Sequence, residues 1–173
     1  MNYKKGLLIR IVLLLIIPYG LFKIIIYPIT KYLVYYINLP FFDISLNGSQ
    51  FMIEGFTLDF ITACAAITAY YLLFLLLITT KNIKLIKFVK IFFLGSLIIL
   101  LANISRIEIL FYLLTNYGIN TFDKVHVLFW DVLSTIIVAG TWIFLVYHFK
   151  IKNVPVYSDI KTLIKEINDT KRN

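Results

Sequence analysis

The chain has 173 residues, 61% of them hydrophobic and 15% charged, with a mean hydropathy of +0.89. This balance is far from that of an ordinary soluble domain, and the length leaves room for a single domain. The single cysteine excludes an intrachain disulfide framework and any CxxC metal or redox motif. The net charge of +8 does not indicate nucleic-acid binding, because its distribution is typical of membrane orientation.

The first hydrophobic run covers residues 7–37. It is too long for one upright membrane span and too short for two spans of about 20 residues with a turn. We predict one span over residues 7–27, ended by Pro28, and then an interfacial stretch rich in tyrosine, because amphipathic aromatic side chains prefer the headgroup level. The basic residues before the run precede no small-x-small cleavage site, so we expect an uncleaved signal anchor.

Residues 41–58 alternate apolar and polar side chains around Asn47-Gly48. An Asn-Gly pair between two such stretches is typical of a hairpin turn. We therefore expect a small β-hairpin on the outer surface of the membrane.

Three later hydrophobic runs are long enough to cross about 30 Å of hydrocarbon. They predict spans over residues 60–79, 91–114 and 125–149. In residues 150–173, apolar side chains recur at helical spacing with lysines on the opposite face. This pattern is typical of an amphipathic helix on the cytoplasmic leaflet, and a frayed, solvated tail is the alternative.

The loop charges give the orientation of the predicted spans. Residues 81–90 contain four lysines and no acidic residue, whereas residues 29–59 contain one lysine and three acidic residues. Basic loops remain in the cytoplasm. The predicted fold is therefore an all-α integral membrane protein with about four transmembrane helices and both termini cytoplasmic.

Arg106 lies well inside the predicted third span. A charge at that depth costs at least about 2.5–3.5 kcal/mol, so it is a functional-site hypothesis unless another group compensates it. Asp131, in the last span, is the candidate for a structural ion pair with Arg106. Asn103 lies three residues before Arg106, on the same helical face, where it can orient the guanidinium.

Two further reactive side chains are expected at a similar depth. Cys64 is predicted about 7–8 Å inside the outer boundary, His126 at the outer mouth of the last span, and the Cα of Arg106 about 15 Å deep. Each of the first two has a simpler interpretation. A lone cysteine in an apolar helix is usually a packing residue, and His126 is suited to an interfacial pair with Asp123.

The order of Cys64 in the segment TACAA, Arg106 in NISRI and His126 at the start of the last run resembles the exosortase/archaeosortase family of membrane-embedded cysteine transpeptidases. A lysine-rich connection also separates the span of Cys64 from the span of Arg106, as in that family. The resemblance covers residues 53–147. Two features depart from the family pattern: Ala65 and Ala66 follow the cysteine, where a hydroxyl residue and glycine are frequent, and many members have more than four spans.

The resemblance implies a cysteine protease or transpeptidase in the cytoplasmic membrane of a prokaryote. It would cleave the C-terminal sorting tails of exported proteins at the outer face and pass the acyl group to an acceptor. Cys64 would be the nucleophile, with its pKa lowered by a nearby cation and a helix start. His126 would carry the proton, and Arg106 would stabilise the thiolate or the oxyanion. The partners would be the sorting tail and membrane lipid, with no cofactor, metal or nucleic acid.

The main alternative is a non-enzymatic membrane scaffold or assembly factor in which an Arg106–Asp131 pair fixes helix packing. A transporter that binds an anion at Arg106 is disfavoured, because the sequence shows no internal repeat and no paired Gly/Pro interruptions. A metal enzyme is disfavoured too, since Cys64, His126, Asp123 and Asp131 lack the spacing of a metal-binding motif.

Overall fold

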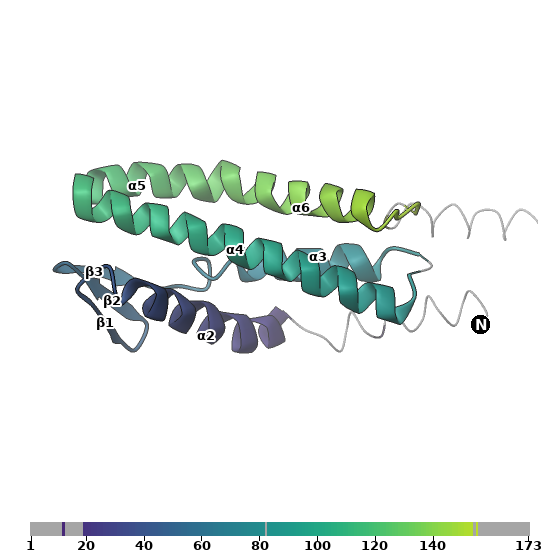
Figure 1. The fold of residues 1–173 in the computed structure, drawn as a ribbon, viewed down its shortest axis with the longest axis horizontal. Helices are drawn as coiled ribbons and strands as arrows, with labels where there is room; N and C mark the ends of the chain where they lie inside the picture. The colour runs from purple at the N-terminus through teal and green to yellow at the C-terminus, as the bar shows by residue number, and fades with distance from the viewer. Residues whose placement is uncertain (1–11, 13–18, 82, 154, 156–173) are drawn as a thin grey trace, which may run out of the picture.

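The computed structural model describes residues 12, 19–81, 83–153 and 155, without the side chains of Trp130 and Asp131. The described part is an elongated bundle of helices with a small sheet at one end (Figure 1). Its elements are α2 (Tyr19–Asn38), β1 (Ile44–Asn47), β2 (Gln50–Ile53), β3 (Phe56–Asp59), α3 (Ile67–Ile78), α4 (Leu85–Tyr117), α5 (Ile119–Leu128), the π-helical turn η1 (Phe129–Leu133) and α6 (Ser134–His148).

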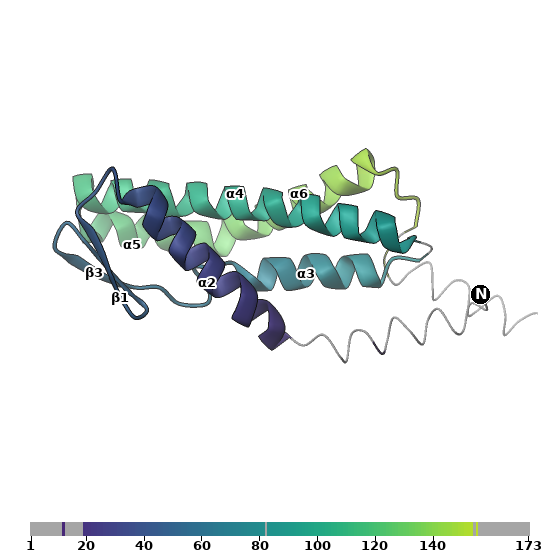
Figure 2. The same cartoon turned by 60° about the horizontal axis from the view of Figure 1, so that its bottom comes forward.

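The long helix α4 is the centre of the bundle. The continuous segment formed by α5, η1 and α6 runs back along it, α3 packs against it, and α2 crosses it at a slant (Figure 2). Gly95 allows the closest approach, because a Cβ atom there would lie 2.7 Å from side-chain atoms of both Leu73 in α3 and Leu145 in α6. The core of the bundle therefore lies along one side of α4.

The three strands form an antiparallel meander in the order β1-β2-β3. A two-residue loop at Gly48-Ser49 joins the first pair, and a second at Glu54-Gly55 joins β2 to β3. Glu54 and Gly55 both have positive φ, 48° and 84°, as a type I′ turn requires. The expected single hairpin over residues 41–58 is thus a three-stranded sheet, since the second turn adds another strand.

The predicted all-α fold with about four transmembrane helices is wrong for the described part of the chain. Among the described residues, α4 is the one helix long and apolar enough to cross a membrane, and the strands add a sheet. Residues 60–66 of the predicted second span form a loop and turn, leaving α3 with 12 residues, about 18 Å. The predicted last span falls on the end of α5, on η1 and on α6, where the π-helical turn interrupts the α-helical pattern and α6 alone has 15 residues.

The predicted first span and the cytoplasmic tail fall mainly on residues outside the described part. Where the chain is described, α2 does not end at Pro28 but continues to Asn38. Proline inside a helix removes one backbone hydrogen bond. The buried residues Thr30, Val34 and Asn38 follow it on one face of α2, and their packing keeps the segment helical.

Candidate active site

A cavity of about 110 Å³ lies at the sheet end of the bundle, between the sheet, the turn before α3, and helices α4 and α5. Three of the side chains that line it are Cys64 from the turn before α3, Arg106 from α4 and His126 from α5. Most of the remaining wall is apolar, and the other lining residues are Phe51, Leu58, Asp59, Phe60, Ile107, Leu110, Phe111 and Phe122.

Cys64 lies in a turn, three residues before α3 begins, and not inside the helix as expected. The turn is held by hydrogen bonds from Cys64 N to Ile61 O (2.9 Å) and from Ala66 N to Ala63 O (3.1 Å). Ala66 has a left-handed conformation, with φ 52° and ψ 32°, and is the N-cap of α3. The chain therefore changes direction immediately after the cysteine.

Two side chains of α4 hold this turn from the other side. Asn103 Nδ2 donates to the carbonyl oxygen of Cys64 at 2.8 Å, and Arg106 Nη2 donates to the same oxygen at 3.3 Å. Both side chains are buried, and Arg106 is only 6% exposed. Its Nε has no hydrogen-bond partner among the described residues. The guanidinium thus fixes the Cys64 backbone and places a buried positive charge beside the thiol.

His126 reaches the cavity from α5, where its ring meets that of Phe122 edge to face, with centroids 5.3 Å apart. Asp123 lies one helical turn earlier on the same helix. Tyr27, from α2, fixes the segment before the cysteine, because its hydroxyl donates to Phe60 O at 2.5 Å. Strands β2 and β3, helices α2, α4 and α5, and the loop before α3 therefore converge on the site.

Both reactive groups are uncharged around neutral pH. Burial raises the pKa of the Cys64 thiol, and the opposing influences, a backbone hydrogen bond and the charge of Arg106, do not outweigh it. Burial also lowers the pKa of His126, as does Arg106, while Asp123 acts in the opposite direction. The expected low thiol pKa is wrong, because desolvation dominates over the nearby cation. A neutral imidazole can still accept a proton from a neutral thiol.

The structure brings together Cys64, Arg106, His126 and Asn103, four of the five residues named from the sequence. Their chemical roles remain predictions. The fifth, Asp131, lies in η1, and its side chain is outside the described part, so the predicted Arg106–Asp131 pair is too.

The aromatic wall of the cavity and the contribution of Tyr27 were not predicted from the sequence. Asp59 was not predicted either; it lines the cavity and accepts a hydrogen bond from Gln50 Nε2 at 2.8 Å. The only available signal was the alternation of apolar residues in the strands, which places Phe51 on the buried face.

No family model, no curated protein and no solved structure matches this chain.

Proposed function

We propose that the protein is a membrane-bound cysteine protease or transpeptidase, resembling the exosortases and archaeosortases, which cleaves C-terminal sorting tails of exported proteins. One observation carries the proposal: a thiol, an imidazole and a guanidinium from separate segments of the chain line the same cavity. These are the nucleophile, the proton carrier and the anion-stabilising charge that acyl transfer through a thioester requires.

In this reaction, the sulfur of Cys64 attacks the carbonyl carbon of the scissile peptide bond while its proton passes to His126. The C–N bond then breaks, and His126 returns the proton to the leaving amine. The acyl group remains on Cys64 as a thioester, until water or an acceptor amine releases it and restores the thiol. Arg106 favours the negative charge that develops on sulfur and on the carbonyl oxygen.

The size of the cavity suits the reacting part of a peptide substrate. Its volume of about 110 Å³ corresponds to roughly three to four water molecules. This space accommodates a carbonyl group and a small side chain. The aromatic wall reduces the access of water, which favours transfer to an acceptor over hydrolysis.

The surface of α4 supports a membrane location. A single apolar helix is weak evidence by itself, because core helices of soluble proteins have the same composition. In α4, however, only 17% of the most apolar stretch is buried, whereas a core helix would be mostly buried. The lysines of residues 81–90 lie at the end of α4 opposite the sheet (Figure 1). We place this basic end on the cytoplasmic side and the cavity toward the outside.

The alternative is a non-enzymatic membrane scaffold. One observation favours it: Asn103 and Arg106 both bind the carbonyl oxygen of Cys64, so they serve the packing of the turn as well as any chemistry. In that case the thiol itself would be dispensable.

The test is to co-express the full chain with an exported protein that ends in an apolar helix and a basic cluster, and to measure removal of the tail. The wild-type chain should release the tail and carry the acyl fragment on Cys64 as a hydroxylamine-sensitive adduct, detected by mass spectrometry. Cys64→Ala should abolish both, and Cys64→Ser should lose the hydroxylamine-sensitive thioester, at unchanged levels in the membrane. Normal processing by Cys64→Ala would overturn the proposal in favour of the scaffold.

A further inference from the structure

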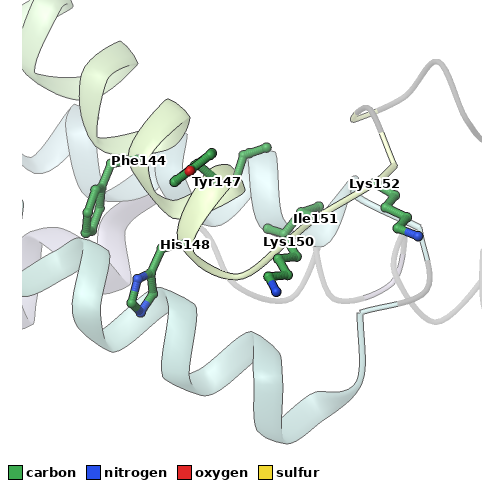
Figure 3. Close-up of a pocket in the computed structure, with 7 residues that line it drawn as sticks. Phe144, Tyr147, His148, Lys150, Ile151 and Lys152 are labelled. Atoms are coloured by element: carbon green, nitrogen blue, oxygen red, sulfur yellow. The ribbon is translucent and has the colours of Figure 1, made fainter.

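A second hollow lies at the opposite end of the bundle, where α6 ends (Figure 3). It is an open groove with a volume of about 600 Å³. Phe144, Tyr147 and Ile151 provide its apolar wall, and His148, Lys150 and Lys152 provide its polar groups. Figure 3 shows His148 and Lys150 pointing to the same side at the end of the helix. None of these residues lines the cavity around Cys64.

The backbone at Lys150 is unusual for a lysine. Ile151 N donates to Val146 O at 2.9 Å and Lys150 N to Tyr147 O at 3.2 Å, the two hydrogen bonds of a Schellman motif. Lys150 occupies the left-handed position of this motif, with φ 49°, where glycine is the usual residue. A charged side chain at a strained position suggests that the side chain itself has a use.

Within the described part of the chain, the two segments around the groove are basic. Asn153 Nδ2 donates to Lys81 O at 2.8 Å and so ties the segment after α6 to the start of the lysine-rich connection. Residues 81–93 and 144–153 together contain six lysines and no acidic residue. Large apolar side chains are exposed beside these lysines, including Leu85 and Ile86 at the beginning of α4. The groove thus combines an apolar wall with a positive rim.

We propose that this groove binds an anionic phospholipid. Lys150 and Lys152 contact the phosphate, and an acyl chain lies along Phe144, Tyr147 and Ile151. A basic cluster at the cytoplasmic end of an apolar helix attracts anionic headgroups, and the apolar wall provides contacts that a free phosphate ion cannot use. The lipid site rests on the proposed membrane location of the protein, but it does not depend on the thiol chemistry at the other end of the bundle.

The test measures lipid affinity of the purified full chain in a neutral detergent, by native mass spectrometry of protein–lipid adducts. The probes are phosphatidylglycerol, phosphatidylcholine with the same acyl chains, and inorganic phosphate. Phosphatidylglycerol should bind at least about five-fold more tightly than phosphatidylcholine. Inorganic phosphate should not displace it at equal concentration.

Three variants locate the binding. Lys152→Gln and Lys150→Gly should each weaken phosphatidylglycerol binding about five-fold, the effect of removing one basic residue near an anionic headgroup. Lys150→Gly also suits the left-handed backbone, so it removes the charge without unfolding the helix end. Lys124→Gln, on α5 at the sheet end, is the matched control and should leave the affinity unchanged.

Three results would overturn the assignment. Equal affinity for the two lipids would show that charge is not recognised. Displacement of the lipid by inorganic phosphate alone would indicate an anion site without an acyl-chain component. An equal loss of affinity in Lys124→Gln and Lys152→Gln would mean that net charge, and not the groove, attracts the lipid.

Discussion

At the sheet end of the bundle, the positive charge of Arg106 is enclosed and directed at one carbonyl oxygen, whereas at the basic end Lys150 and Lys152 stand exposed on an open groove. A charge in a low-dielectric site acts strongly on its few neighbours, and an exposed charge is screened by water and salt. The first arrangement therefore suits the control of proton affinities, and the second suits the attraction of a mobile anionic partner.

The two histidines show the same difference. His126 lies on the wall of the enclosed cavity, where burial and Arg106 both lower its pKa. His148 lies on the rim of the open groove, with its ring stacked on Phe144 at a centroid distance of 5.5 Å. Two residues of one type thus lie in different environments. Substitutions at the enclosed end and in the core between the two ends test this difference.

The largest effect is expected for His126→Ala. Removing a general acid–base group slows a reaction by about 100- to 10,000-fold. Tail release should fall by that factor, while the melting temperature in detergent remains close to that of the wild type, because the ring is only partly buried. Wild-type processing by this variant would show that the enclosed end is a structural polar cluster without proton transfer.

The second prediction concerns the bond between Asn103 and the Cys64 carbonyl. Asn103→Leu removes the 2.8 Å donor and leaves that oxygen with Arg106 alone, at 3.3 Å. An under-satisfied buried polar group costs about 1–3 kcal/mol, and thermal unfolding in detergent should show the loss. Asn116→Leu makes the same change on α4 at an exposed bond to Tyr112 O and should be nearly neutral. If Asn103→Leu and Asn116→Leu lowered the melting temperature equally, burial would not strengthen the hydrogen bond from Asn103 to the Cys64 carbonyl.

Charge distribution and helical rise predicted that Cys64, Arg106 and His126 lie near one another, and all three line one cavity. A helix rises by a fixed distance per residue, so sequence separation translates directly into position along α4 and α5. The same periodicity places Asn103 and Arg106 on one face, and both bond to the Cys64 carbonyl.

Hydropathy could not predict how residues 60–66 fold. The segment is apolar and rich in alanine, which favours a helix. In the structure the carbonyl of Cys64 is bound by side chains about 40 positions later in the chain, and Ala66 adopts a left-handed conformation. These long-range contacts override local propensity and shorten α3. The predicted second span failed for this reason, because hydropathy measures the length of an apolar segment and not its conformation.

The thiol pKa was mispredicted for a related reason. A sequence reveals which charges are near a residue once the helices are assigned. It does not reveal how much water is excluded by side chains from other elements, such as Phe51 and Phe60. The effect of desolvation on the pKa of Cys64 could therefore be recognised only from the structure.

The third prediction tests the core that connects the two ends. Gly95→Ala places a Cβ atom 2.7 Å from buried side-chain atoms of Leu73 and Leu145, and overpacking of this kind costs about 1–3 kcal/mol. Gly140→Ala, on the exposed side of α6, meets no atom within 4 Å. It should stabilise the helix by up to about 1 kcal/mol. The two changes should shift the melting temperature in opposite directions, and a stabilising Gly95→Ala would contradict the close approach of α3 and α6 to α4.

The smallest effect concerns the proton affinity of His126. As a general base, His126 must be unprotonated, so activity is lost only as the pH falls through its pKa. Burial and Arg106 lower that pKa, which places the acid limb of kcat/KM below the ordinary histidine value of about 6.5. Asp123 raises the pKa, so Asp123→Asn should move the acid limb to still lower pH. A profile of kcat/KM between about pH 4.5 and 8 reports the pKa of the free enzyme. If the acid limb moved to higher pH in this variant, Asp123 would not raise the pKa of His126. The acid limb would then not report the electrostatic influence of the enclosed site on His126.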